Sequence, residues 1–364
     1  LIKRGGNLIV DEKISQFKKI KKIAISKKLK LNTLKKNKKN FEILSHHFEG
    51  DSQLLTIKYK NTIKKVKLNL IGKIQLKNIL MAIIAAEKSN IKFEKILSVI
   101  HKIRPVKGRF EKIGKIKNQS KVILDYAHTP EALKTCLLNL REQYPCKKIS
   151  VLFGCGGNRD QNKRSKMGKI ASNFSDEVYL TDDNPRFEKP YEIRRDIRKG
   201  IKTKKIIEIS DRTKAISHAI KNLNTGNILL VAGKGHEKIQ VIGKRKIYFS
   251  DKKKILEAIK IKNQNLNTNL KLNIIKELSG YNKNLSQLSL NQARINSREV
   301  KKNDIFFAIK GKKKDGNKFI KEAFKKKSSI AIVNKIKNNY KNKCQIKVKD
   351  TLKFLTATSK NFRK

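Results

Sequence analysis

The stretch Ile228-Leu229-Leu230-Val231-Ala232-Gly233-Lys234-Gly235-His236-Glu237 places a short apolar run directly before a polar, glycine-rich turn. The same order of run and turn occurs three more times earlier in the chain. The runs are Val122-Ile123-Leu124, Ile149-Ser150-Val151-Leu152-Phe153 and Val178-Tyr179-Leu180-Thr181, and the turns after them are Asp125-Tyr126-Ala127-His128-Thr129-Pro130, Gly154-Cys155-Gly156-Gly157-Asn158-Arg159-Asp160 and Asp183-Asn184-Pro185-Arg186. Apolar runs of this length that are bounded by turn residues predict four buried β-strands.

A helical pattern follows each of the first three turns, so strands and helices alternate along this part of the chain. Such alternation predicts a mainly parallel sheet with helices packed on its faces. In the first of these helices Thr129 is the expected N-cap and Pro130 the first residue, and the helix should end near Gln143. Because ligands bind beyond the carboxyl ends of the strands in an open parallel sheet, we expect the four turns to line one cleft.

The length and charge of the chain limit the classes of protein that it can belong to. Its 364 residues allow two or three domains. The formal net charge of +59 raises the alternative of a nucleic-acid-binding protein, which predicts tight and steeply salt-dependent binding. However, the excess is almost entirely lysine, spread from Lys3 to Lys364, and aromatic residues make up only 6% of the chain. Base readout relies on arginine and aromatic stacking, so we interpret the charge as a solvated basic surface and expect no nucleic-acid partner.

Cysteine usage and hydropathy indicate the compartment. The four cysteines, Cys136, Cys146, Cys155 and Cys344, form no Cys-x-x-Cys pair, and free thiols are typical of a reducing compartment. No apolar run approaches the roughly 18 residues that a membrane-spanning helix requires. We therefore expect a cytoplasmic protein without membrane insertion.

Pattern and composition divide the chain into four segments. Residues 1–106 show alternating strand patterns followed by two helices, and residues 107–261 hold the four turns and end on a helix that Asp251 caps. Residues 262–271 are rich in Asn, Lys, Gln and Thr and are predicted to be a linker, and residues 272–364 form a small α/β domain. The fold class is therefore α/β and multi-domain. Because the chain starts without Met and stops within a helical pattern, we expect it to be part of a longer polypeptide.

The charged residues of the four turns suit a ligand that carries both signs of charge. Arg159 and Arg186 each offer a planar guanidinium that can bind a carboxylate through two hydrogen bonds, and Glu237 offers the opposite charge. An amino acid with two charged ends would fit. The alternative for the charged residues is a surface salt-bridge network, and for Asn184-Pro185 a simple turn. The alternative for His128 is a residue at a helix start that is bonded to the backbone.

The segment from about Leu70 to Ile259 closely resembles the Mur ligases of peptidoglycan synthesis, and Asp183-Asn184-Pro185-Arg186 matches the string that marks diaminopimelate specificity in that family. The resemblance implies a Rossmann-like C-terminal ligase domain at residues 107–261, preceded by the remainder of an α/β central ATPase domain. It implies meso-diaminopimelate and UDP-N-acetylmuramoyl-L-alanyl-D-glutamate as substrates. The residues implied to hold diaminopimelate are Arg159, Asp183, Asn184, Pro185, Arg186, Gly233 and Glu237.

The same resemblance implies ATP and Mg²⁺, with ATP contacted by Asn78, Arg109, Asp125 and His128. In such a ligase a substrate carboxylate takes the γ-phosphoryl group of ATP, and the amino group of the incoming amino acid then displaces phosphate. The chain departs from the family because it contains no Gly-x-x-x-x-Gly-Lys-Ser/Thr string. The magnesium-binding Glu and the carbamylated Lys of the family have no counterpart in it either, so the catalytic residues are unknown. We expect the isolated chain to be inactive. The alternative is a non-catalytic module that binds diaminopimelate and nucleotide.

The final segment resembles the N-terminal, UDP-substrate domain of a Mur ligase. The matching strings are Asn296-Ser297-Arg298-Glu299-Val300, Asp304-Ile305-Phe306-Phe307-Ala308-Ile309-Lys310-Gly311 and Asp315-Gly316-Asn317-Lys318-Phe319-Ile320. The resemblance implies that this segment begins a second ligase, the one that adds D-alanyl-D-alanine, within a fusion of two ligases or a fragmentary gene. The residues implied to contact the UDP-linked substrate are Ser297, Arg298, Lys310 and Gly311. Their alternative role is as scaffold residues of turns.

Overall fold

The computed structural model describes residues 2–34, 41–59, 62–202, 205–285, 287–311, 314–340 and 342–363. The chain divides into two compact units, Leu1–Ile259 and Lys260–Lys364, which are described separately here.

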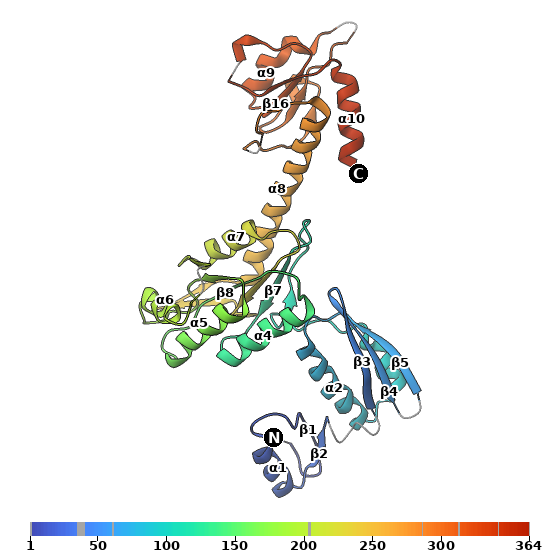
Figure 1. Ribbon diagram of the computed structural model, residues 1–364, viewed down its shortest axis with the longest axis vertical. Helices are drawn as coiled ribbons and strands as arrows, with labels where there is room; N and C mark the ends of the chain where they lie inside the picture. Colours follow the sequence, from blue (N-terminus) through green and yellow to red (C-terminus); the bar gives the residue numbers. More distant parts are fainter. Residues whose placement is uncertain are drawn as a thin grey trace. The chain divides into compact units, whose positions relative to one another are not determined.

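A six-stranded sheet, which includes β7 and β8, forms the centre of the first unit (Figure 1). Its strand order is β10-β9-β8-β11-β7-β6. All neighbouring strands run parallel except β6, which pairs antiparallel with β7. This arrangement confirms the predicted, mainly parallel sheet. The bounds are β6 Glu111–Lys112, β7 Lys121–Asp125, β8 Ile149–Phe153, β9 Glu177–Leu180, β10 Ile206–Glu208 and β11 Ile228–Ala232.

Helices cover both faces of this sheet because its strands are apolar on both sides. Helices α4 (Pro130–Gln143), α5 (Asn162–Phe174) and α6 (Pro190–Arg198) share one buried core with the strands. Helix α7 (Arg212–Asn222) packs on the opposite face (Figure 1). The expected N-cap of α4 is confirmed, since the Thr129 hydroxyl accepts a hydrogen bond from the backbone N–H of Ala132 at 3.3 Å.

A second core lies in the part of the first unit that precedes the six-stranded sheet. Strands β3 (Phe41–Glu49), β4 (Ser52–Tyr59) and β5 (Thr62–Leu68) form an antiparallel sheet, and helices α2 (Lys73–Lys88) and α3 (Phe93–Ile100) cover it. Before them, strands β1 (Asn7–Val10) and β2 (Lys30–Thr33) pair in parallel on either side of helix α1 (Phe17–Ser26) in the chain.

Asp51, at the turn between β3 and β4, ties the two cores of the first unit together. Its carboxylate contacts Lys112 Nζ at 2.5 Å and Lys121 Nζ at 3.1 Å, and it accepts a hydrogen bond from the Tyr144 hydroxyl at 2.7 Å. Burial alone would raise the pKa of Asp51, but these hydrogen bonds lower it overall. These contacts join residues of the two cores within the first unit.

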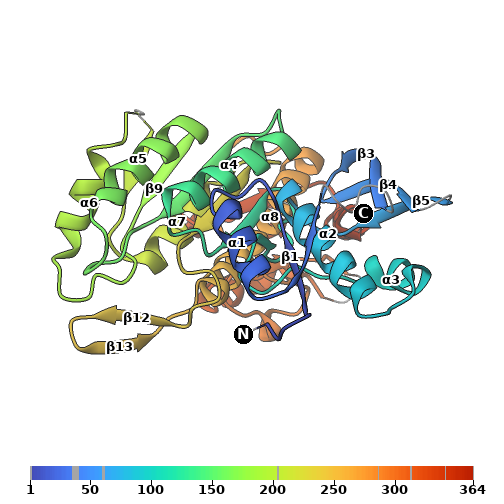
Figure 2. The same cartoon turned by 90° about the horizontal axis from the view of Figure 1, so that it is seen from below.

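A β-hairpin that the sequence patterns did not predict follows β11. Its strands, β12 (Ile239–Ile242) and β13 (Arg245–Tyr248), pair antiparallel, and Figure 2 shows the hairpin extending away from the sheet. Every residue of β13 is exposed, so the hairpin lacks the buried apolar face that gives most strands a recognisable pattern. Its contacts with the loop after β9 make it part of the candidate site described below.

Helix α8 (Asp251–Ser279) corrects one of the sequence predictions. The helix was expected to stop near Ile261, before a linker at 262–271, but residues 262–271 are helical. No Gly or Pro occurs between residues 251 and 279, so nothing in the polar composition breaks the helix. It ends before Gly280, whose φ of +65° is typical of a glycine that follows a helix. None of the described helices has the length and apolar character required to cross a membrane.

The second unit contains a four-stranded parallel sheet with the order β14-β15-β16-β17. Buried residues form one core on each of its faces. Helices α9 and α10 follow β15 and β17 in the chain, which confirms the predicted small α/β domain. The bounds are β14 Ala293–Arg294, β15 Ile305–Phe307, α9 Ile320–Lys325, β16 Ile330–Val333, β17 Gln345–Lys347 and α10 Thr351–Arg363, with short 3₁₀ helices at Ser297–Glu299, Gly316–Phe319 and Asn338–Tyr340.

Candidate functional site

The turns after β7, β8, β9 and β11 meet at one edge of the six-stranded sheet, as predicted. They enclose a cleft of about 450 Å³. Its lining is mainly polar and comes from all four turns and the start of α5: Tyr126, His128, Thr129, Gly156, Arg159, Asp160, Lys163, Asp183, Asn184, Arg186, Gly233 and Glu237. The cleft therefore lies at the carboxyl ends of the strands, where ligands bind in open parallel sheets.

Glycine allows the turn after β8 to pack directly against the turn after β9. A Cβ atom on Gly157 would lie 2.0 Å from the carbonyl oxygen of Pro185, so no other residue fits without moving one of the two turns. The Gly157 N–H donates to the Asn184 carbonyl at 2.9 Å. This contact fixes the distance between the loop that carries Arg159 and the loop that carries Arg186.

Arg186 is held by its backbone as well as by its side chain. Its φ is +52°, an uncommon conformation for a residue other than glycine. Its N–H donates to the Val241 carbonyl at 3.0 Å, and its carbonyl accepts from the Gly243 N–H at 2.6 Å, so the hairpin holds this conformation. Its guanidinium Nη1 donates to the Gly157 carbonyl at 2.8 Å. The arginine fork is thereby positioned at the wall of the cleft.

Arg159 is exposed and also lines the cleft. The loop that carries it is anchored by Glu188, which accepts hydrogen bonds from the Asn158 N–H and, at 2.7 Å, from the buried Arg164. Burial alone would raise the pKa of Glu188, but these hydrogen bonds lower it overall. The Arg164 guanidinium is therefore bonded inside the protein and supports the loop, whereas Arg159 presents its positive charge to the cleft.

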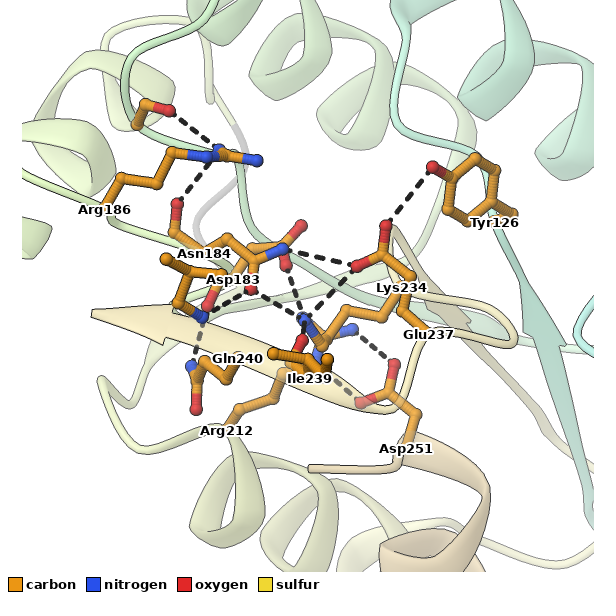
Figure 3. Close-up of polar contacts among 12 residues, drawn as sticks. Tyr126, Asp183, Asn184, Arg186, Arg212, Lys234, Glu237, Ile239, Gln240 and Asp251 are labelled. Atoms are coloured by element: carbon orange, nitrogen blue, oxygen red, sulfur yellow. Dashed lines mark hydrogen bonds and ion pairs between the residues drawn. The ribbon is translucent and has the colours of Figure 1, made fainter. Parts of the chain in front are cut away.

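Glu237 supplies the negative charge that the sequence predicted. One of its oxygens accepts a hydrogen bond from the Tyr126 hydroxyl at 3.2 Å, and the other accepts from Asn184 Nδ2 at 3.3 Å (Figure 3). Burial and the charge of Glu237 raise the pKa of Tyr126, so this tyrosine stays a hydrogen-bond donor at neutral pH. The cleft thus combines two arginines with a carboxylate held in a defined position.

Two family models match the chain. Residues 108–235 match the model described as "Mur ligase, glutamate ligase domain", and residues 290–363 match the one described as "Mur ligase family, catalytic domain". The chain belongs to the Mur ligase family.

Two similar curated proteins are both named UDP-N-acetylmuramoyl-L-alanyl-D-glutamate–2,6-diaminopimelate ligase. The protein from Rickettsia typhi is 39% identical over 248 residues, which are 68% of this chain and 49% of that protein. The protein from Fusobacterium nucleatum is 42% identical over 222 residues, which are 58% and 46% of the two chains. The chain thus spans about half the length of the curated relatives that it matches.

Two solved structures are similar to the chain. A structure of a UDP-N-acetylmuramoyl-L-alanyl-D-glutamate–2,6-diaminopimelate ligase is 28% identical, with a TM-score of 0.51 and coverage of 70% of this chain and 53% of that chain. The Mycobacterium tuberculosis folylpolyglutamate synthase in complex with ADP has a TM-score of 0.51 and covers 62% and 52% of the two chains. Its identity is only 14%, so it shows a shared fold alone.

Three of the four residues expected at ATP, Arg109, Asp125 and His128, lie close together. The Arg109 guanidinium stacks on the Tyr126 ring at 4.5 Å, and His128 Nδ1 is hydrogen bonded to the Tyr126 carbonyl at 3.0 Å. Asp125 is buried, and its carboxylate accepts hydrogen bonds from the N–H groups of Phe110 and Ala127, both at 2.7 Å. Asp125 therefore links strand β7 to the segment that carries Arg109. Asn78 is exposed on α2.

A second cavity, of about 560 Å³, adjoins Arg109. Most of its charged lining is basic, with Glu111 as the one acidic member of the lining: Val106, Lys107, Gly108, Arg109, Glu111, Leu124, Gly235, His236, Lys238, Ser250 and Lys252. Such a lining suits an anionic ligand.

The four residues predicted to contact a UDP-linked substrate in the second unit differ in their surroundings. The Ser297 hydroxyl is buried and donates to Glu322 at 2.6 Å, as a scaffold residue would. Arg298 and Lys310 are exposed, and the Gly311 N–H donates to the Lys314 carbonyl at 2.9 Å. A cavity of about 620 Å³ in this unit is lined instead by Gln264, Asn265, Asn267, Thr268, Lys271, Ser289, Leu290, Asn291, Gln292, Arg294, Lys301 and Asp304.

Sequence reasoning missed two buried cations beneath the cleft. Lys234 and Arg212 have fully buried side chains, and each contacts a carboxylate. Lysine and arginine are mostly exposed in proteins, so their type gave no reason to expect burial. For Lys234, the sequence signal that could have indicated burial was its place in the Gly233-Lys234-Gly235 string at the end of a buried strand.

Proposed function

We propose that the cleft binds meso-diaminopimelate as the incoming amino acid of an ATP-dependent amide ligation. The observation that carries this proposal is the placement of Arg159 and Arg186 in the same cleft as Glu237 and Asn184. Diaminopimelate has a carboxylate and an ammonium at each end. The cleft offers guanidinium donors for a carboxylate, and the Glu237 carboxylate and Gly233 carbonyl as acceptors for an ammonium.

The proposed acceptor is UDP-N-acetylmuramoyl-L-alanyl-D-glutamate, which is one of the two compounds in the names of the similar ligases. In the proposed reaction its carboxylate takes the γ-phosphoryl group of ATP, and the amine of diaminopimelate displaces phosphate. The basic cavity beside Arg109 is the proposed place for part of the nucleotide. Among the described residues, no group of three or more His, Cys, Asp or Glu side chains is arranged to hold a metal ion. We propose Mg²⁺ as a cofactor that the nucleotide phosphates would help to hold, because Mg²⁺ is usually bound by only one or two carboxylates together with phosphates and water.

Selective binding of meso-diaminopimelate over L-lysine tests the proposal. Lysine lacks the distal carboxylate, so a guanidinium in the cleft would lose its partner. We expect lysine to bind about 30-fold or more weakly than diaminopimelate, which corresponds to the loss of one charge-assisted hydrogen-bonded pair. Isothermal titration calorimetry on the 364-residue chain measures both affinities. Equal affinities for the two amino acids would rule out the assigned specificity.

The second candidate function is a binding module without catalysis, which the absence of a Walker-type phosphate loop from the sequence favours. We expect the 364-residue chain alone to bind diaminopimelate but to release no phosphate from ATP in the presence of the acceptor and diaminopimelate. A phosphate-release assay, with product analysis by mass spectrometry, makes the measurement. Ligation by the chain on its own would refute the expectation that the phosphate loop is required.

For the second unit we propose contact with a UDP-linked substrate, as part of a second ligase. The match of residues 290–363 to the model "Mur ligase family, catalytic domain" supports placing this unit in the same family, and the substrate contact is proposed from the resemblance of its sequence strings. Its position after the match at residues 108–235 is the reason to propose that the chain joins parts of two ligases. Arg298, Lys310 and Gly311 remain the proposed contacts, whereas the Ser297 hydroxyl is already bonded to Glu322.

A further inference from the structure

Lys234 lies in the turn after β11 with none of its side chain exposed, and it is not among the residues that line the cleft. Its ammonium donates hydrogen bonds to Asn184 Oδ1 at 2.9 Å, to the Ile239 carbonyl at 2.8 Å and to Asp183 Oδ1 at 3.3 Å. All three of its N–H groups are therefore used. Figure 3 shows the ammonium at the centre of this cluster.

These bonds join three segments of the first unit. Asp183 and Asn184 belong to the loop after β9, Ile239 begins β12 of the hairpin, and Lys234 itself follows β11. Lys234 Nζ also lies 3.5 Å from Glu237 Oε2. A buried ammonium is stable only when its charge and its donors are matched, so this one stabilises a single arrangement of its partners.

The orientation of the Asn184 side chain follows from Lys234. Two donors, Lys234 Nζ at 2.9 Å and the Val241 N–H at 3.1 Å, point at Asn184 Oδ1. The amide nitrogen is thereby turned toward Glu237, whose Oε2 lies 3.3 Å away. An amide rotated by half a turn would place its NH₂ group against two donors, which is unfavourable.

The position of Arg186 depends on the same cluster. The hairpin is fastened to the loop after β9 by the Ile239 carbonyl, which Lys234 holds, and by Gln240, whose side chain donates to the Asp183 carbonyl at 2.7 Å. The next hairpin residue, Val241, accepts the Arg186 N–H. Displacement of β12 would therefore release the backbone conformation on which the direction of the Arg186 side chain depends.

We propose that Lys234 is a positioning residue of the amino-acid site, which holds Asn184, Glu237 and Arg186 in their binding geometry without touching the ligand. This inference rests on the proposed function, because it assigns a role to Lys234 in the binding of an amino acid. It explains why a lysine in this turn is fully buried although the chain is covered with exposed lysines.

The test is the variant Lys234→Met, which keeps the length of the side chain and removes its charge and donors. We expect meso-diaminopimelate to bind at least about 30-fold more weakly at a temperature where circular dichroism shows the variant to be folded. The matched control is Lys244→Met, an exposed lysine at the tip of the same hairpin, which should bind within about twofold of the parent chain. A folded Lys234→Met variant with an affinity within about threefold of the parent chain would overturn the proposal.

A second measurement needs no ligand, so it separates this inference from the proposed function. We expect the side-chain amide signals of Asn184, assigned by comparison with Asn184→Ala, to shift in the ¹H–¹⁵N spectrum of Lys234→Met and to stay in place in Lys244→Met. Unchanged Asn184 signals would overturn the positioning role even if the parent chain binds diaminopimelate. Shifted signals in a protein whose parent chain does not bind diaminopimelate would support the positioning of Asn184 and refute the proposed function.

If Lys234→Met does not fold, the diaminopimelate affinity of Gln240→Ala is measured in its place. Gln240 does not line the cleft, and its side chain is partly exposed. It fastens the hairpin to the carbonyl of Asp183, so its removal loosens the same attachment from the other side. We expect a loss of about fivefold in diaminopimelate affinity, as for one hydrogen bond of ordinary strength. An unchanged affinity in Gln240→Ala would overturn the proposal.

Discussion

Replacement of Arg186 by Ala is expected to weaken the binding of meso-diaminopimelate about 100-fold. The proposed contact is a charge-assisted pair between the guanidinium and a ligand carboxylate, and its loss costs on the order of 3 kcal/mol. The backbone should stay in place, because the bonds to Val241 and Gly243 do not involve the side chain. Alanine at a φ of +52° is also no more strained than arginine. Isothermal titration calorimetry measures the loss.

Two further variants make this prediction specific. Arg186→Lys keeps the charge but not the planar fork, so we expect an intermediate loss of about tenfold. Arg198→Ala removes an exposed arginine from α6, outside the cleft, and should bind like the parent chain. If Arg186→Ala bound diaminopimelate within threefold of the parent chain, Arg186 would not be a residue that binds a ligand carboxylate.

The substitution Asp251→Asn is expected to destabilise the first unit by about 3–5 kcal/mol, because it leaves a buried guanidinium without its counter-charge. Arg212 donates to Asp251 through Nε and Nη2, both at 2.8 Å, and neither side chain is exposed. Burial alone would lower the pKa of Arg212, but Asp251 raises it overall. Arg212 Nη2 also donates to the Ala232 carbonyl at 2.9 Å, so the pair supports the end of β11.

Hydrogen-exchange mass spectrometry in increasing urea measures this effect on peptides from β7, β8 and β11, without interference from the second unit. The double variant Arg212→Met with Asp251→Leu should recover most of the loss, because no buried charge remains. Lys254→Ala is the matched control on α8, since it breaks the partly exposed pair with Glu257 and should cost at most about 0.5 kcal/mol. A cost below about 1 kcal/mol for Asp251→Asn would contradict the importance of the buried pair.

The middle of the sheet and the cleft could be predicted because β7, β8, β9 and β11 are short apolar runs, each with a turn signal after it. Strand β8 has the predicted bounds, and so does helix α4, whose cap and proline are readable in the sequence. Arg159, Arg186 and Glu237 were placed together for the same reason, because parallel strands end at one edge. Sequence patterns therefore suffice where local signals and topology agree.

Other features could not be predicted because their structure depends on partners far away in the chain. Lys234 is buried only because Asp183, Asn184 and Ile239 surround its ammonium, and no local pattern encodes that arrangement. The polar composition of residues 262–271 concealed a helix, since composition separates a linker from a polar helix only when glycine or proline is present. Ser297 lies in a sequence string that resembles a substrate-binding turn. Its hydroxyl is nevertheless bonded to Glu322, 25 residues further along the chain, and the local sequence could not indicate that bond.

The position of β11 affects how the sheet can form as the chain is synthesised. Strand β11 lies between β7 and β8, although it is encoded about 75 residues after β8. Until residues 228–232 are available, β7 and β8 have no partner between them and each exposes an open edge, which favours slow folding and pairing with other chains. The same insertion brings the turn with Gly233 and Glu237 to the cleft. Closure of the sheet and completion of the cleft are therefore one late event in folding.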